Sequence, residues 1–379
     1  MSDQRRPPVL ITDIINQASS QLREAGIETP EHDAKLLLAE AAGVELRDVD
    51  RALLMGEELG TTGQLAVFRA MLDRRAKREP LQYITGHAPF RYLDLKVGPG
   101  VFIPRPETET VVQAGLDWLT KNGMIHPCVV DLCAGSGAIG LSVVSEVPGS
   151  QVWAVELSPN TAEWTRRNLS ETAKKYPSIA SNYHLEIADA TSFATLAQLD
   201  GTVDIVITNP PYVPQTDIPE QPEVRDWDPE LALYGGSMDG TLIPERIIER
   251  ACRLLKPGGV LVMEHDVTQG GSSRGLCQGH RIRCRIDRPG LDGSRPLPVC
   301  SVLSPTNPTF PWDCILVSVI ALSHNKNNLL RVQSRSGYNS PRQTSDERDV
   351  NDGHKPCDVV LWYANYVSGT SHAHIPRVG

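Results

Sequence analysis

The sequence of 379 residues has no hydrophobic run of about 18 residues, the length that a membrane-spanning helix needs. Its N-terminal residues do not have the apolar core of a secretory signal peptide. Eight cysteines are present, but none forms a Cys-x-x-Cys pair, so the sequence contains no zinc-binding or redox motif. We therefore expect a soluble, cytoplasmic protein with reduced thiols, no bound metal and no membrane association.

Positive charge is also scarce, because 37 Lys and Arg face 46 Asp and Glu, giving a net charge of −9. A protein that mainly coats nucleic acid carries the opposite sign, so we expect no stable nucleic-acid binding. The imbalance is uneven along the chain. Residues 1–266 hold 24 basic and 38 acidic side chains, whereas residues 267–379 hold 13 and 8. The two parts therefore differ in the sign of their net charge, which is negative before residue 267 and positive after it.

The length predicts two or three domains. Apolar stripes at helical spacing predict helices over 10–26, 30–43 and 64–77. These stripes are best explained by mutual packing, so we predict a small helical-bundle domain over residues 1–85. Such an accessory domain is suited to gripping a partner.

Short β-branched runs that alternate with helical stretches begin near residue 125. The predicted strands are 128–132, 151–157, 184–189, 203–209 and 259–265. This alternation is typical of βαβ units, so the predicted fold class is α/β, a Rossmann-like domain with a mostly parallel sheet over residues 86–266. Ligands of such sheets bind beyond the carboxyl ends of the strands.

A turn of small residues follows the first of these strands. It comprises Asp131, Leu132, Cys133, Ala134, Gly135, Ser136 and Gly137. Its two glycines can adopt positive φ and let the backbone approach a ligand closely. Taken alone, the turn suits an NAD site or an ordinary strand-to-helix connection equally well.

The next two strands end in carboxylates. Glu156, followed by Leu157 and the helix-capping Ser158, can accept hydrogen bonds from both hydroxyls of a ribose. Its spacing from the glycine turn favours a nucleoside-containing ligand over a merely exposed acid. Asp189 and Ala190 lie where the exocyclic amine of an adenine can be met.

The fourth strand runs into Asn209, Pro210, Pro211 and Tyr212. Two prolines fix φ and remove two backbone donors, which leaves the nearby carbonyls as acceptors. The Asn209 side-chain oxygen and a backbone carbonyl can together hold a planar NH2 group, and Tyr212 can pack beside it. The alternative is an ordinary Pro-Pro turn with an Asn cap.

These motifs, taken in order, resemble those of the HemK/PrmC family, the peptide chain release factor glutamine N5-methyltransferases. They belong to the class I methyltransferases that depend on S-adenosylmethionine (SAM) and carry an NPPY motif. The resemblance rests on EPLQYITG (79–86), FIPRPETE (102–109), DLCAGSGAIGL, VELSP and NPPYVP, and covers about residues 8–266.

The resemblance implies a site, residue by residue. The SAM-binding set would be Asp131, Cys133, Ala134, Gly135, Ser136, Gly137, Glu156, Leu157, Asp189, Ala190 and Asn209. Asn209 and the Pro210 carbonyl would hold the target glutamine, with Pro211 and Tyr212 beside it, and Asn209, Pro210 and Tyr212 would be catalytic. Pro104, Arg105 and Glu107 would belong to a charged loop over the cleft. Cys133 and Ala134 stand where the family often has Gly and Thr.

Two other functions fit part of the sequence. An adenine N6 amine presents the same planar NH2 group, so a nucleobase amino-methyltransferase is one alternative. The acidity of residues 1–266 counts against it. The other is a SAM-binding or partner-binding protein without activity, whose sheet lacks its last strands and exposes an edge.

Residues 267–379 depart from the family pattern, which would continue with a helix and two strands. They are rich in Arg, Cys, Ser and Pro, and we expect an irregular, poorly ordered tail in which the apolar run 314–322 forms a strand. A basic arm that touches RNA is the alternative, but its arginines are not interleaved with aromatic residues.

We predict that this tail is read out of the ancestral frame, through a frameshift or an error in gene prediction near codon 267. Charge and pattern change abruptly at that one point. Sequencing the gene across this codon tests the idea, and an in-frame reading with the same codons would contradict it.

Overall fold

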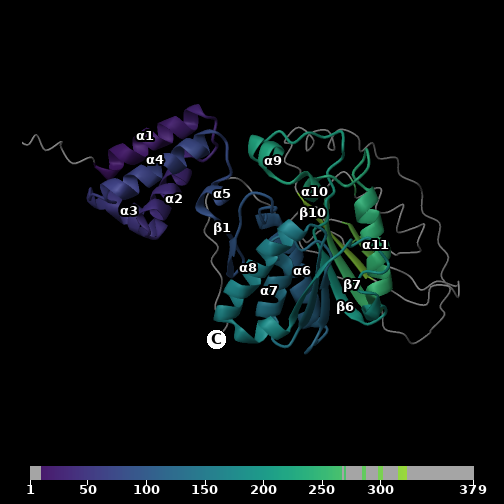
Figure 1. The fold of residues 1–379 in the computed structure, drawn as a ribbon. Coiled ribbons are helices and arrows are strands. Elements are labelled where there is room, and N and C mark those ends of the chain that lie inside the picture. Colours follow the sequence, from purple (N-terminus) through teal and green to yellow (C-terminus); the bar gives the residue numbers. More distant parts are fainter. Residues whose placement is uncertain (1–9, 267–268, 270–283, 287–297, 302–314, 322–379) are drawn as a thin grey trace, which may run out of the picture.

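The computed structural model describes residues 10–266, Gln269 and the strands 284–286, 298–301 and 315–321. Figure 1 shows helices α1 to α4 as a separate bundle, with α5 and β1 lying between it and a sheet covered by helices. No helix in the described part of the chain is long and apolar enough to cross a membrane.

The bundle confirms the three helices expected from the apolar stripes and contains two more. Its helices are α1 (Ile11–Glu24), α2 (Pro30–Ala42), α3 (Leu46–Met55), α4 (Thr62–Ala76) and α5 (Leu81–Thr85). Leu22, Leu37 and Phe68 are among the buried residues that form its core. Pro30 begins α2, and Gly43 ends it in the left-handed conformation that glycine tolerates best.

A hairpin and a helix connect the bundle to the sheet. Strands β1 (His87–Phe90) and β2 (Leu93–Lys96) pair antiparallel, and α6 (Pro106–Lys121) follows. The expectation that the whole segment 102–109 is a loop is wrong, because Pro106 occupies the first turn of α6, where its missing N–H costs nothing.

The central sheet confirms the five predicted strands. These are β3 (Cys128–Asp131), β4 (Gln151–Glu156), β5 (Tyr183–Ile187), β6 (Val203–Thr208) and β7 (Leu255–Asp266). They lie parallel in the order β5-β4-β3-β6-β7. The chain therefore builds outward from β3 and then returns to its other side, so the topological switch point lies between β3 and β6.

Helices cover both faces of this sheet (Figure 1). On one face, α6 and α7 (Ala138–Glu146) pack against Val129 and Ile205, with α8 (Pro159–Lys175) alongside. On the other, α11 (Leu242–Leu254) packs against Val130 and Val206. Neighbouring strand residues thus point to opposite cores, as expected for a buried parallel sheet.

Short elements complete the described chain. Two 3-10 turns are η1 (Pro177–Ser181) and η2 (Ala197–Leu199), and two short helices after β6 are α9 (Pro222–Trp227) and α10 (Glu230–Leu233).

Three strands from residues 267–379 join the sheet beside β7. Strand β10 (Ile315–Ala321) lies in the run expected to form a strand and pairs parallel with β7 over its whole length. It pairs antiparallel with β9 (Pro298–Ser301), which pairs with β8 (Cys284–Ile286). Here the expectation of missing strands and an exposed β7 edge is wrong, while most of the expected irregular tail lies outside the described residues.

Ion pairs connect the bundle to α9. Arg75, buried in α4, donates from Nη1 to Glu223 Oε1 at 2.8 Å and from Nε to Asp33 Oδ2 at 2.8 Å. Arg78 Nη2 donates to the second Glu223 oxygen at 2.6 Å. Burial alone would raise the pKa of Glu223, but its two arginine partners lower it below its usual value. Glu223 is therefore ionised at neutral pH and ties the two parts together.

We predict that Glu223→Ala lowers the free energy of unfolding by about 1–3 kcal/mol, because it leaves a buried guanidinium short of a partner. Thermal unfolding measures the loss, and hydrogen exchange should rise in α9. The matched control is Glu171→Ala, which removes the exposed Lys174 pair and should leave stability essentially unchanged, because solvent screens that pair. Equal stability of the two variants would contradict the prediction.

Candidate active site

A cavity of about 530 Å³ lies beyond the carboxyl ends of the parallel strands. Of the predicted site residues, those that line it are Pro104, Cys133, Ala134, Gly135, Ser136, Glu156, Leu157, Asp189, Ala190, Asn209 and Pro211. They come from the turns after β3, β4, β5 and β6 and from the segment before α6. Asp131, Gly137 and Pro210 are not part of the lining.

Asp131 supports the glycine turn from beneath. Its fully buried carboxylate accepts hydrogen bonds from the backbone N–H groups of Cys133 at 3.3 Å and Gly140 at 3.2 Å. Burial raises the pKa of Asp131 to about 7, although these two donors oppose the shift. Gly135 and Gly137 have φ of 56° and 87°, which confirms the predicted positive values.

The Glu156 carboxylate closes the turn over the cavity. Its Oε2 accepts from the Gly135 N–H at 2.9 Å and its Oε1 accepts from the Ser158 N–H at 2.8 Å. Burial raises its pKa above the usual value, and the backbone donors oppose this effect. The carboxylate keeps lone-pair capacity beyond its backbone donors, so it can accept further hydrogen bonds from a diol.

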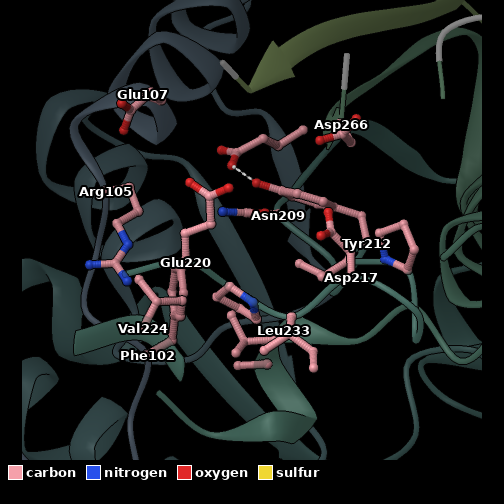
Figure 2. Close-up of a pocket in the computed structure, with 16 residues that line it drawn as sticks. Phe102, Arg105, Glu107, Asn209, Tyr212, Asp217, Glu220, Val224, Leu233 and Asp266 are labelled. Carbon is pink, nitrogen blue, oxygen red and sulfur yellow. Dashed lines mark hydrogen bonds between the residues drawn. The ribbon is translucent and has the colours of Figure 1, made fainter. Parts of the chain in front are cut away.

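Asn209 also borders a second, smaller pocket of about 110 Å³ (Figure 2). In Figure 2, Asn209 lies near the centre, with Arg105 and Glu107 on one side and Tyr212 and Asp266 on the other. Of the three predicted cleft-loop residues, Pro104 thus lines the large cavity, while the other two line this pocket. Asn209 is therefore positioned to contact the occupants of both spaces.

Arg105 holds two sides of the small pocket together. Its Nη2 donates to Asp228 Oδ2, and its guanidinium lies 4.8 Å from the centre of the Phe102 ring. The ion pair thus connects the segment before α6 to the loop after α9. A planar cation between a ring and a carboxylate gives the pocket wall a fixed geometry.

Two residues that the sequence analysis missed are connected to Asn209: Thr108, which lines the large cavity, and Glu264, which lines the small pocket. Asn209 Nδ2 donates to Thr108 Oγ1 at 3.1 Å, and Thr108 Oγ1 donates to Glu264 Oε2 at 2.7 Å. Tyr212 OH donates to the other Glu264 oxygen at 3.1 Å, the contact dashed in Figure 2. The one available signal was the position of Glu264 at the carboxyl end of a predicted strand, where ligands bind.

Burial governs ionisation in this region. It raises the pKa of Glu264 to about 7, with the Thr108 and Tyr212 hydrogen bonds opposing the shift. It also raises the pKa of the Tyr212 hydroxyl and of the Cys133 thiol well above their usual values, so both keep their protons at neutral pH. Cys133 is therefore a small apolar part of the cavity wall and no nucleophile.

Gln269 supports the same loop from outside. Its Nε2 donates to the Tyr212 carbonyl at 2.7 Å and to the Asp239 carbonyl at 3.0 Å. The backbone after Asn209 is therefore fixed by side chains from distant parts of the chain.

Comparison with known proteins agrees with this geometry. The PrmC N-terminal domain family matches residues 13–86, and a family described as conserved hypothetical protein 95 matches residues 81–224.

Three relatives illustrate the range of similarity. The release factor glutamine methyltransferase of Streptomyces coelicolor is 44% identical over 68% of this chain and 85% of that protein. That of Corynebacterium glutamicum is 39% identical over 70% and 89%. The 4-amino-L-phenylalanine/4-methylamino-L-phenylalanine methyltransferase of Streptomyces pristinaespiralis is 37% identical over 67% and 82%. The chain therefore belongs to the release factor glutamine methyltransferase (PrmC) family of SAM-dependent enzymes.

Proposed function

We propose that the protein methylates the N5 amide nitrogen of the glutamine in the Gly-Gly-Gln motif of class I peptide chain release factors. The observation that carries this proposal is the position of Asn209, which borders both the large cavity and the small pocket. The relatives named release factor glutamine methyltransferase support the substrate. Release factors act in translation, so we place the enzyme in the cytoplasm.

The large cavity suits SAM. Glu156 would accept hydrogen bonds from the ribose hydroxyls, the turn around Gly135 would lie along the methionine part, and Asp189 and Ala190 would flank the adenine. When bound, SAM supplies a methyl group on a positively charged sulfur, an electrophile that needs no metal. The apolar wall formed by residues such as Ala134 is compatible with excluding water from that group.

The small pocket suits a glutamine side chain. Asn209 Oδ1 and the Pro210 carbonyl would accept the two hydrogens of its NH2 group, and Tyr212 would pack beside it. An amide nitrogen is a weak nucleophile, so the work of these residues is to hold it in line with the methyl group and enrich its electron density. The nitrogen gains a methyl group and loses one hydrogen as a proton.

The division of labour between domains is also part of the proposal. Residues 1–85 would recognise the release factor, and residues 86–266 would carry out transfer. The acidic charge of residues 1–266 is compatible with a protein partner and unfavourable for gripping a nucleic-acid strand. The adenine N6 alternative is therefore not favoured. The relative that is named for an amino-phenylalanine substrate shows that related chains act on other planar amines.

We predict that Glu156→Gln weakens SAM binding about tenfold, because an amide NH2 replaces one oxygen that should accept from the ribose. Isothermal titration calorimetry measures the dissociation constant. Glu186→Gln is the matched control, since Glu186 lies on neighbouring β5 but does not line the cavity. Wild-type affinity in Glu156→Gln, with thermal unfolding unchanged, would refute the ribose assignment.

The proposed function predicts labelled-methyl transfer from SAM to a purified class I release factor. Transfer should disappear when the Gly-Gly-Gln glutamine is replaced, and Asn209→Ala should lower kcat by at least about 100-fold by removing the acceptor that orients the amide. Thermal unfolding of Asn209→Ala serves as the folding control, because Asn209 itself lines the large cavity. Label that persists without the glutamine would overturn the proposal, and transfer to 4-amino-L-phenylalanine instead would favour a small-molecule substrate.

A further inference from the structure

A continuous hydrogen-bonded chain connects Asn209 to a buried carboxylate. It runs from Asn209 Nδ2 to Thr108 Oγ1 over 3.1 Å and from Thr108 Oγ1 to Glu264 Oε2 over 2.7 Å. Only 4% of Thr108 and 2% of Glu264 is exposed to solvent, so water does not compete for these bonds. Three separate elements supply the chain: the loop after β6, the first turn of α6, and the end of β7.

The negative charge of the Glu264 carboxylate decides which group donates and which accepts in each of these hydrogen bonds. An ionised carboxylate only accepts hydrogen bonds, so the single hydroxyl hydrogen of Thr108 must point to Glu264. Thr108 Oγ1 can then only accept from Asn209, which requires the NH2 end of the Asn209 amide to face Thr108. The carbonyl oxygen of that amide, Oδ1, takes no part in this series of hydrogen bonds and can accept one from a ligand.

We propose that Thr108 and Glu264 are positioning residues that fix which end of the Asn209 amide faces the substrate. The inference rests on the proposed function, in which Oδ1 accepts a hydrogen from the glutamine NH2 group. If the amide turned over, its own NH2 group would face the substrate NH2, and two donors would meet without an acceptor.

The surroundings of Glu264 make this arrangement sensitive to protonation. Thr108 and Tyr212 donate to its two oxygens, the negative charge of Glu107 on α6 opposes its ionisation, and the Arg105 guanidinium favours it. Asp266 on the same strand also lines the small pocket. A protonated Glu264 can donate to Thr108 Oγ1, which releases the Thr108 hydrogen toward Asn209 and removes the preference for one amide orientation.

The kcat values of three variants test the hydrogen bonds that connect Asn209 to Glu264. Thr108→Val removes the hydroxyl at nearly constant shape and should lower kcat about 10- to 100-fold at saturating SAM, a condition that is needed because Thr108 also lines the large cavity. Thr108→Ser keeps the hydroxyl and should restore kcat to within threefold of wild type. Thr172→Val is the matched control, since Thr172 donates to a backbone carbonyl within α8, and its kcat should stay unchanged.

The pH dependence of kcat separates positioning from a purely structural role. The pKa of Glu264 is raised to about 7, so the ionised form that orients Asn209 is lost as the pH falls through that value. Wild-type kcat should therefore decrease below pH 7. Glu264→Gln should be slower than wild type above pH 7 and show no such decrease, so that the two proteins converge at low pH. Identical pH profiles for the two proteins, or wild-type kcat in Thr108→Val, would overturn the proposal.

A measurement without release factor keeps the two proposals distinguishable. The Asn209 side-chain NH2 signals of the ¹⁵N-labelled full chain, assigned by their loss in Asn209→Ala, should shift with pH near 7 in the wild type and not in Glu264→Gln. If they do so while no release factor is methylated, the positioning chain stands and the proposed function fails. If release factor is methylated but these signals do not respond to pH or to Glu264→Gln, the positioning chain fails and the function stands.

Discussion

The parallel pairing of β3 with β6 is the constraint on which the site depends. Val129 and Val130 of β3 are in register with Ile205 and Val206 of β6, so the turns after these strands meet at one edge of the sheet. One turn carries the glycines and the other carries Asn209. A parallel sheet that builds outward in both directions from β3 leaves a crevice there, and the large cavity occupies it.

The cost of burying charge links the chemistry of the site to its rigidity. A carboxylate that is 2% exposed, as Glu264 is, persists only if donors replace its lost water. Thr108 and Tyr212 are those donors, and both belong to segments that border the small pocket. The hydrogen bonds that stabilise the buried Glu264 carboxylate therefore also hold two walls of the small pocket in place. Arg105 fixes a third wall through its ion pair with Asp228.

Local signals in the sequence were enough for the parts of the fold that depend on short segments. Pro30 and Gly43 mark the ends of α2 because proline and glycine have particular backbone requirements, and both marks are correct. The β-branched runs located the five parallel strands β3 to β7. The segment 102–109 was misassigned because its prolines also suit a loop, and only packing of the following apolar residues on the sheet shows that Pro106 begins a helix.

The site could be predicted only where its residues are contiguous in sequence. The stretch 209–212 is recognisable because four neighbouring residues combine acceptors, rigidity and an aromatic ring. Thr108 lies in the FIPRPETE motif and Glu264 at the end of a predicted strand, but Thr108 precedes Glu264 by 156 residues and Asn209 by 101, so nothing local indicates that they meet. These residues come together because of the order of the strands and because α6 packs across β6 and β7. Patterns in short stretches of sequence do not predict such long-range contacts.

Strand β10 covers the edge of β7 although the sequence after residue 266 departs from the family pattern. An edge strand requires partners for its backbone N–H and C=O groups, and a run of β-branched residues of the right length can provide them whatever else it encodes. Residues 315–321 read ILVSVIA and pair with β7 from Val260 to Asp266, so Val319 lies opposite Glu264. The strand that carries the buried carboxylate is thus flanked on both sides, by β6 and by β10. Because the backbone ladder asks of β10 only a run of strand-forming residues, the carboxyl end of β7 can keep its position even where the sequence beyond it has diverged.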